Sequence, residues 1–411
     1  MAVRLPARLV PLWPSLKVAY THATRAVSPF TRQLSRIRGG YLPHGSVATV
    51  DESVAEAGGR MWVARSEERV HRSAPLGEPP GHPTFVADTE LVVPRAAVAE
   101  LPDGRVLGKH RVVIDGLGRM VEEFGGLYWC TRRWSEHEVF WHPFPDPPLE
   151  VSGVLGVLAG RGDISYYHFL FDILPRLAFL ETPGVPTPER WYVPLQHGWQ
   201  REALELLGFL PREGVVDADQ VFHVQAETLL VPGLPDVEMR TPPWAVSFIR
   251  ERLRPPELGL VPGRRIYVTR GQKRNNRIVR NEREVMEVLG DRGFTVVDPG
   301  TLSLVEEVRT FAEAEWIVAP HGAALANLVF ASPGASVVEL FAPDYVQGSY
   351  WKLADCVPGL GYRYLLGAGR GPRNGRMDGV MSDITVDLPA LERALDALPV
   401  ELPPAAARAH R

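Results

Sequence analysis

Short apolar runs alternate with amphipathic stretches through the C-terminal half of the chain. The apolar runs predict strands and the stretches with a three-to-four-residue period predict helices. Strands are predicted over 265–270, 294–298, 316–319, 336–340 and 362–366, and helices over 281–291, from Ser303 onward and over 349–357. Asn281 with Glu284, and Ser303 with Glu306, have capping-box spacing and mark two helix starts. This alternation predicts a parallel sheet with helices on both faces.

The N-terminal half is less regular and reads mainly as short strands and turns. Strands are predicted over 84–87, 105–108, 111–115 and 153–158, with Asp-Gly turns at 103–104 and 115–116. An apolar segment of helical length follows over 163–180, and Pro175 should kink or divide it. Two further helices are predicted over 199–207 and 244–253.

A length of 411 residues exceeds what one hydrophobic core usually supports and suggests two domains. A proline-rich stretch at 255–262 marks the expected boundary. We therefore expect four segments: a basic, poorly ordered extension over 1–60, an N-terminal lobe over 61–255, a C-terminal lobe over 256–370, and a loop, helix and tail over 371–411.

Composition narrows the class of protein. Hydrophobic residues make up 45% and charged residues 23%, which is typical of a folded globular chain. The net charge of −4 provides no general attraction for nucleic acid. The two cysteines, Cys130 and Cys356, are too few and too far apart for a disulfide framework or a cysteine metal site. With no membrane-spanning run and no cleavable signal pattern, a cytoplasmic location is expected.

The first 50 residues hold seven arginines and lysines but no aspartate or glutamate. This pattern predicts a poorly ordered basic extension, or alternatively a segment on the anionic inner face of a membrane with Trp13 at the interface. Pro6, Pro11 and Pro14 argue against a long amphipathic helix there.

A basic loop follows the predicted strand 265–270. Its cations are Arg270, Lys273, Arg274, Arg277 and Arg280, and Asn281 then opens a helix. A diphosphate requires several donors and the positive end of a helix, which this arrangement offers at the carboxyl end of a parallel strand. The alternative is a solvated charged loop.

His321-Gly322-Ala323 follows the end of the predicted strand 316–319, and Asn327 lies six residues after His321. Small residues let a ligand approach the amides of Gly322 and Ala323, and His321 either donates to a diphosphate or has a structural role. Glu339, near the end of a later strand, is expected to accept hydrogen bonds from ribose hydroxyls. The segment is not a dinucleotide fingerprint, because no G-x-G-x-x-G occurs at a strand–helix turn.

His168 and Asp172 are four residues apart on the apolar helix and so share one face. They form either a general base with its orienting partner, in either assignment, or a pair that only satisfies itself. Asp217 and Asp219 resemble a metal-binding D-x-D pair, but the sequence nearby offers no further ligand set, and no metal is expected.

Four stretches together resemble the family 61 glycosyltransferases of bacterial surface-polysaccharide synthesis and of eukaryotic protein and xylan modification. They are residues 166–177, Thr269-Arg270 with Arg277 to Glu282, His321 to Asn327, and 333–340, and the resemblance extends over about 100–365. The chain departs from the family pattern at Ser165, where Asn is usual, and at Phe169, where Trp is frequent.

The resemblance implies an α/β, two-lobed GT-B-like fold, with two Rossmann-like domains facing a cleft and added β-strands in the N-terminal lobe. It implies an inverting, metal-independent transfer from a nucleotide-sugar to a glycan, glycolipid or glycoconjugate of the cell surface, and UDP is the commonest carrier in this family. Arg270 and Arg277 would contact the diphosphate, His321 and Asn327 would shape the nucleotide site, and Asp172 would be the base. A sugar-nucleotide epimerase or hydrolase, and a non-catalytic sugar-nucleotide-binding scaffold, are the alternatives.

Overall fold

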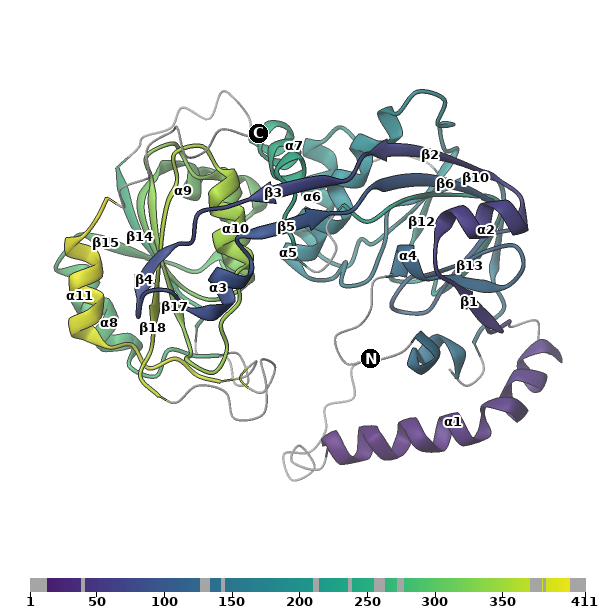
Figure 1. The fold of residues 1–411 in the computed structure, drawn as a ribbon, viewed down its shortest axis with the longest axis horizontal. Helices are drawn as coiled ribbons and strands as arrows, with labels where there is room; N and C mark the ends of the chain where they lie inside the picture. The colour runs from purple at the N-terminus through teal and green to yellow at the C-terminus, as the bar shows by residue number, and fades with distance from the viewer. Residues whose placement is uncertain are drawn as a thin grey trace.

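Two large β-sheets organise the chain. The computed structural model describes residues 13–37, 41–125, 134–141, 145–209, 214–235, 239–254, 263–271, 277–369, 379 and 382–399. Figure 1 shows one sheet on each side of the molecule, with helices between them. The mixed α/β class predicted from the sequence is confirmed.

The six-stranded sheet is parallel throughout. Its order is β15 (Phe294–Val297), β14 (Arg264–Val268), β16 (Ala314–Pro320), β17 (Ser336–Phe341), β18 (Gly361–Leu366) and β4 (Leu76–Glu78). Counted from β14, the first five strands have the order 2-1-3-4-5 of a doubly wound sheet. Successive strands are added in one direction from β14 to β15 and in the other from β16 onward, so the strand order reverses between β14 and β16. Ligands of such sheets bind at that point, beyond the carboxyl ends of the strands.

Alternate residues of these strands serve two cores. Ile266 and Val337 contribute to the core on the face toward α9 (Leu304–Glu313), η7 (Ala323–Phe330) and α10 (Ser349–Cys356). Tyr267 and Val338 contribute to the core on the face of α8 (Glu282–Gly290) and α11 (Leu388–Asp396). The two-residue period of a strand explains this division. All five predicted strands and the predicted helices of this half are confirmed.

The ten-stranded sheet is mixed. The main path runs β1 (Gly45–Val47), β9 (Arg119–Val121), β8 (Val112–Ile114), β7 (Arg105–Leu107), β13 (His223–Pro232), β10 (Leu149–Val157), β11 (Arg190–Val193) and β12 (Val215–Asp217). β6 (Ala96–Pro102) pairs with β13 and with β2 (Arg60–Arg65). β13, β10, β11 and β12 form a run of parallel neighbours, and β1 pairs with β9 in parallel, whereas the other described pairs of this sheet are antiparallel. The N-terminal half is thus more antiparallel than the expected Rossmann-like domain.

A helical layer joins the two sheets. It contains α5 (Tyr166–His168), the π-helix η4 (Phe169–Ile173), the 3₁₀-helix η5 (Leu174–Glu181), α6 (Gly198–Leu206) and α7 (Pro243–Leu253). Their apolar residues share one core with η7 and α10. The predicted helix 163–180 therefore exists but changes type twice. Pro175 lies at the first turn of η5, where its missing N–H is tolerated.

One segment crosses the predicted domain division at residue 255. The strand β4 pairs with β18, and α3 (Pro83–Ala87) packs its Phe85 against the core of the six-stranded sheet. The ribbon of β3 (Glu68–His71) and β5 (Glu90–Val93) leads into and out of this excursion (Figure 1). The strand predicted over 84–87 is wrong, because Pro83 and the His82 side chain, which caps the amide of Thr84, start a helix instead.

The N-terminal region is more ordered than predicted. The helix α1 (Trp13–Ile37) forms despite Pro14, which lies in the first turn, and Pro29. The helix α2 (Val50–Ala57) is anchored by the fully buried Val50. The expectation of a poorly ordered extension over 1–60 is therefore wrong for both helices. Pro6, Pro11, and the side chain of Trp13 lie outside the described part of the structure.

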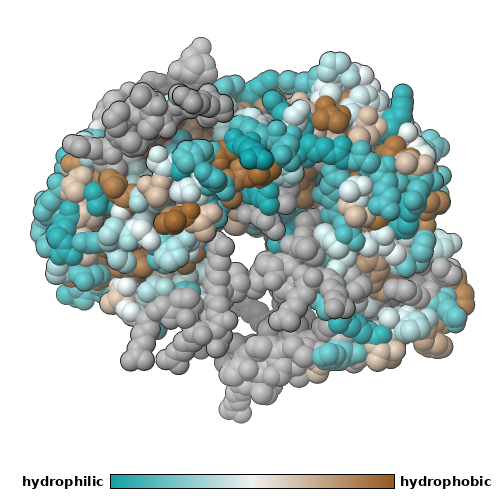
Figure 2. All heavy atoms as spheres, viewed as in Figure 1, coloured by the Kyte–Doolittle hydropathy of each residue, from teal (hydrophilic) through white to brown (hydrophobic). Residues whose placement is uncertain are grey.

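Four short helices and the surface remain to be described. The remaining helices are α4 (Glu122–Gly125), η2 (Trp134–Glu136), η3 (Glu138–Phe140) and η6 (Pro299–Thr301). Among the described residues, no helix is long and apolar enough to cross a membrane. Figure 2 shows hydrophilic residues over most of the visible face, with hydrophobic ones scattered among them.

Candidate functional site

Arg270 and His321 meet where the strand order reverses. Arg270 follows β14 and His321 follows β16, which are paired neighbours. A guanidinium nitrogen (Nη1) of Arg270 donates to the carbonyl oxygen of His321 at 2.7 Å. The two predicted ligand segments are therefore adjacent, at the position where a doubly wound sheet binds its ligand.

Gly322 is the residue that lets Arg270 approach. A Cβ at position 322 would lie 1.6 Å from the Nη1 of Arg270, which no side chain permits. Burial, and then the charge of Arg277, lower the pKa of Arg270 to about 10. Arg270 thus remains a cation at neutral pH, but one whose charge is incompletely solvated.

Arg277 supplies a second cation to the same place. It has a left-handed backbone with φ of +50°, and its guanidinium lies over the Tyr345 ring at 4.9 Å. Its Nη1 is buried and has no hydrogen-bond partner among the described residues. A buried, unpartnered cationic donor is costly unless a ligand accepts from it. An anionic group held between Arg277 and Arg270 would meet this need.

His321 is held neutral between these arginines and a buried acid. Its Nδ1 lies 2.5 Å from the Oε1 of Glu339, and the hydroxyl of Tyr362 donates to the other carboxyl oxygen. Burial, then the charges of Arg277 and Arg270, keep the pKa of His321 well below its usual value. Burial raises the pKa of Glu339 well above its usual value, which favours the protonated form of this carboxyl. Its O–H then donates to Nδ1, and the ring carries its own proton on Nε2.

Three residues predicted to bind the donor, Glu339, Asn327 and Asn281, are instead hydrogen-bonded to other protein groups. Glu339 is fully buried with both oxygens engaged, so it cannot reach a ribose. Asn327 is also fully buried, between the hydroxyl of Tyr166 and the carboxylate of Glu307. The amide of Asn281 is bound to both the N–H and the C=O of Val386. The sequence patterns located structural polar residues here and not ligand contacts.

The remaining predicted residues have different outcomes. Ala323 is exposed at the start of η7, next to the buried Gly322, and their amides lie at the amino end of this helix. The predicted capping box at Ser303 is confirmed, but Asn281 makes no side-chain cap bond, since its amide is engaged with Val386. Arg274 and Lys273 lie outside the described residues.

His168 and Asp172 form the predicted pair. The Nδ1 of His168 lies 2.8 Å from the Oδ2 of Asp172, and the pair spans the start of the π-helix η4. Such π segments are frequent at functional sites. The His168 side chain is 26% exposed and that of Asp172 is 14% exposed, so the imidazole is the more accessible of the two. Gly162, with φ of +79°, leaves room for the His168 ring.

A buried arginine fixes the segment that carries Asp172. The Nε of Arg176 donates to the backbone carbonyl of Asp172 at 2.8 Å, and its Nη1 donates to that of Ala159 at 3.0 Å. Gly160 leaves room for the guanidinium, because a Cβ there would lie 2.5 Å from Nη2. Burial lowers the pKa of Arg176 to about 10, so it still carries its charge. The π-helix is thereby tied to the end of β10.

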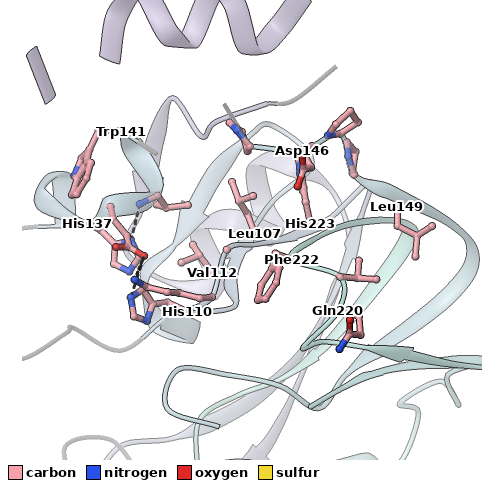
Figure 3. Close-up of a pocket in the computed structure, with 18 of the residues that line it drawn as sticks. Leu107, His110, Val112, His137, Trp141, Asp146, Leu149, Gln220, Phe222 and His223 are labelled. Carbon is pink, nitrogen blue, oxygen red and sulfur yellow. Dashed lines mark hydrogen bonds and ion pairs between the residues drawn. The ribbon is translucent and has the colours of Figure 1, made fainter. Parts of the chain in front are cut away.

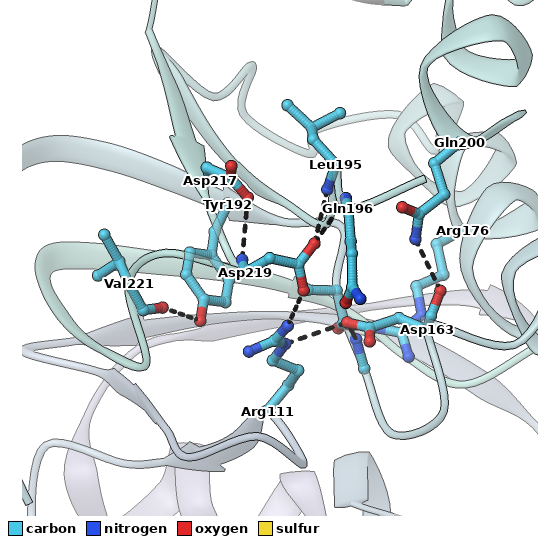
Figure 4. A network of polar contacts seen from close by, with 12 residues as sticks. Arg111, Asp163, Arg176, Tyr192, Leu195, Gln196, Gln200, Asp217, Asp219 and Val221 are labelled. Carbon is cyan, nitrogen blue, oxygen red and sulfur yellow. Dashed lines mark hydrogen bonds and ion pairs between the residues drawn. The ribbon is translucent and has the colours of Figure 1, made fainter. Parts of the chain in front are cut away.

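Figure 4 shows why Asp219 is not an open metal ligand. Its Oδ1 accepts from Arg111 at 2.7 Å, and its Oδ2 accepts from the amides of Leu195 and Gln196, each at 2.9 Å. The Oδ1 of Asp217 accepts the amide of Asp219 itself. These contacts make the pair a structural turn and remove the basis of the D-x-D interpretation. Within the described ranges, no cluster of three His, Cys, Asp or Glu side chains could hold a metal.

Aromatic rings connect the His168 pair with the arginine site. The ring of Tyr167 lies 5.5 Å from that of His168 and 5.8 Å from that of Tyr350, and Tyr350 lies 5.2 Å from His321. The two sites thus lie on either side of a tyrosine pair. Sequence reasoning gave Tyr167, Tyr345 and Tyr350 no role. The last two follow the carboxyl end of β17, which is the signal that could have identified them.

Comparison with known proteins agrees with this geometry. A family model described as Glycosyltransferase 61 matches residues 166–338. That span begins at Tyr166, on the helix of His168 and Asp172, and includes Arg270, Arg277 and His321. No curated protein matches the chain. Residues 166–338, which carry both halves of the candidate site, are therefore similar to glycosyltransferase family 61.

Proposed function

We propose that this protein is an inverting, metal-independent glycosyltransferase that takes its sugar from a nucleoside-diphosphate donor. The observation that carries the proposal is the buried, unpartnered Nη1 of Arg277 beside Arg270 and His321. Two neighbouring cations, one of which has a buried donor without a partner among the described residues, favour a doubly charged ligand such as a diphosphate. The switch point between β14 and β16 is a common site for such ligands. A UDP-linked sugar is the donor we expect.

The leaving diphosphate would be stabilised by groups already in place. Arg270 and Arg277 would offset the charge that grows on it, and the Nε2–H of His321 would donate to it. The amides at the start of η7 would add to this field. A GT-B-like arrangement, with the donor on the six-stranded sheet and the acceptor on the side of His168, is the geometry that this mechanism requires.

His168 is the residue we propose as base. The Nδ1–H of His168 donates to Asp172, which leaves Nε2 as the acceptor for a proton. The greater exposure of His168 favours this assignment over the reverse one. The imidazole would take the proton of an acceptor hydroxyl as that oxygen attacks the anomeric carbon, and Asp172 would stabilise the imidazolium.

Calorimetric titration tests the donor site. The full-length protein is titrated with UDP, GDP, CDP and NAD in the presence of EDTA, and Arg270→Ala and Arg277→Ala are compared with it. Arg283→Ala is the matched control, because Arg283 is an exposed arginine of α8 that only pairs with Glu287. We expect one nucleoside diphosphate to bind, at least about tenfold more weakly in both site variants.

The opposite result is equally informative. Binding that needs a divalent metal, or that is unaffected by both site variants, would overturn the proposed donor site. Nucleotide-sugar turnover without any acceptor would instead indicate a hydrolase or an epimerase. Donor binding with no turnover of any kind would indicate a scaffold.

The acceptor we propose is a glycan, glycolipid or glycoconjugate of the cell surface. The helix α1 leaves Tyr20, Val27, Phe30 and Ile37 exposed in a region without acidic residues up to Val50. These features favour peripheral contact with an anionic membrane. Co-sedimentation with phosphatidylserine vesicles tests it. Unchanged co-sedimentation after deletion of residues 1–40 would contradict it.

A further inference from the structure

A cavity of about 710 Å³ lies at the amino ends of β10 and β13. Its walls come from the β7–β8 turn, the η3 segment, the chain entering β10 and the chain entering β13, as Figure 3 shows. Tyr20 of α1 also lines it. None of the described residues of the donor site or the His168 pair is among its lining residues. The cavity is therefore separate from the proposed reaction centre.

His223 presents a buried acceptor to this cavity. The residue is 4% exposed, and its Nδ1–H donates to the backbone carbonyl of Asp146 at 2.7 Å. That bond leaves Nε2 unprotonated, and Nε2 is buried without a hydrogen-bond partner in the described structure. Burial also lowers the pKa of His223, so the ring is neutral. An O–H or N–H donor of a ligand would satisfy it.

His137 presents a donor in the same cavity. Its Nδ1 accepts the amide of Val139 at 3.1 Å, which leaves the ring proton on Nε2. Burial, and then the neighbouring His110, lower the pKa of His137 to about 4. The cavity thus offers one neutral imidazole that accepts and another that donates.

The charged groups of the cavity compensate each other. Glu138 lies 3.2 Å from the Nε2 of His110 and 3.4 Å from the Nζ of Lys109. Burial alone would raise the pKa of Glu138, but the hydrogen bond from His110 and the charge of Lys109 lower it to about 2. Among the described lining residues, a phosphate or carboxylate would find no cluster of cations. An uncharged ligand fits better.

Most of the remaining lining is apolar, apart from Asp146 and Gln220. Trp141 and Phe222 contribute aromatic rings, and Pro145, Pro147 and Pro148 add further apolar surface. Apolar faces combined with a few fixed donors and acceptors are typical of small-molecule sites. Rings and hydroxyls of a sugar match this combination, whereas an alkyl chain would leave Nε2 of His223 unsatisfied.

The cavity wall is connected to the loop beside the candidate base. The guanidinium of Arg111 lies 5.4 Å from the Phe222 ring, and its Nε donates to the Oδ2 of Asp163 at 3.1 Å. Asp163 adjoins Gly162, against which the His168 ring packs. A chain of three contacts thus joins the cavity to the proposed base.

We propose that this cavity binds an uncharged sugar residue, and that this residue belongs to the acceptor glycan at some distance from the hydroxyl that reacts. The sugar-binding part stands on the cavity alone. The acceptor part rests on the proposed function.

Saturation-transfer difference NMR on the full-length protein tests the proposal. The probes are methyl glycosides of glucose, galactose, mannose, xylose and N-acetylglucosamine, and octyl β-glucoside. At least one methyl glycoside should receive saturation. His223→Ala should weaken its binding about tenfold, and Phe222→Ala, which alters a half-exposed ring, should also weaken it. His71→Ala is the matched control, because His71 is an exposed histidine on β3.

Three outcomes would overturn the proposal: no methyl glycoside binds, binding is equal in wild type and both cavity variants, or only the octyl protons of octyl glucoside are saturated. Titration of the same samples with UDP, GDP and CDP separates this inference from the proposed function. Sugar binding without binding of any of these nucleotides would overturn the donor site and leave the sugar cavity standing. Nucleotide binding without sugar binding would do the reverse.

Discussion

The hydroxyl of Tyr166 donates a hydrogen bond to the Oδ1 of Asn327 at 2.7 Å, across 161 positions of sequence. The amide of Asn327 in turn donates to Glu307 at 2.5 Å. This contact ties the helix of the candidate base to η7, whose first turn adjoins the arginine site. It sets the distance between the two halves of the proposed chemistry, so its loss should affect stability.

Replacement of Tyr166 by Phe should destabilise the protein. The substitution leaves the fully buried Oδ1 of Asn327 without its donor, which costs about 1–3 kcal/mol. Urea unfolding followed by fluorescence measures this, with the exposed Val86→Ala as control. A change below about 0.5 kcal/mol would show that water replaces the hydroxyl.

Glu307 should make stability fall as the pH rises from about 4.5 to about 7. Burial raises its pKa from 4.5 to about 7, against the hydrogen bonds from Asn327 and Tyr166 and with a smaller contribution from Glu202. The unfolded chain loses its proton first, so the unfolded state gains relative stability through this window. The contribution of Glu307 is full below pH 4.5 and is lost above about 7, on the order of 2–3 kcal/mol.

The variant Glu307→Gln isolates this effect. Gln keeps a carbonyl that accepts from Asn327 but does not titrate, so the fall in stability between pH 4.5 and 7 should become shallower. Urea unfolding at several pH values measures the difference between the two proteins. An identical pH dependence in both would assign the titration to another group.

Gly322→Ala should weaken nucleotide binding much as Arg270→Ala does. The new Cβ would displace the Arg270 guanidinium from its place 2.7 Å from the His321 carbonyl. We expect a loss of about tenfold or more in affinity, corresponding to roughly 1.4 kcal/mol. Gly290→Ala is the control, because nothing lies within 4 Å of a Cβ there. Unchanged affinity in Gly322→Ala would mean that Arg270 does not contact the ligand.

Asn281→Ala should show the opposite pattern. Its side-chain amide makes hydrogen bonds with both the N–H and the C=O of Val386. The loss of these two bonds should destabilise the protein by about 1–3 kcal/mol. Nucleotide affinity of the folded protein should stay within about twofold, because both polar atoms of the side chain are engaged with Val386. A large loss of affinity without loss of stability would restore the ligand role predicted from the sequence.

Chemical rescue distinguishes His168 from Asp172 as base. Either residue changed to Ala should lower the rate of nucleoside-diphosphate release by about 10²–10⁴. If His168 is the base, added imidazole should restore part of the activity of His168→Ala but not that of Asp172→Ala. Rescue of Asp172→Ala alone, by formate, would reverse the assignment.

The periodic pattern of the C-terminal half sufficed to predict its strands and helices, because its central strands β16 and β17 are buried on both faces. The same reasoning placed Arg270 and His321 at strand ends, where ligands bind. It also placed His168 and Asp172 on one helical face, which their 2.8 Å contact bears out. These are local properties, which depend only on spacing along the chain.

Other features depended on contacts between distant segments. The position of β4 beside β18, the use of Asn281 and Asn327 as structural supports, and the engagement of Asp219 by Arg111 involve partners about 105 to 290 positions away in sequence. A residue type and a spacing do not reveal which partner satisfies a buried amide or carboxylate. The sequence alone determined which polar groups were present near the site. Only the tertiary structure decided which of them have hydrogen-bond partners within the protein, and which, like the Nη1 of Arg277, remain available to a ligand.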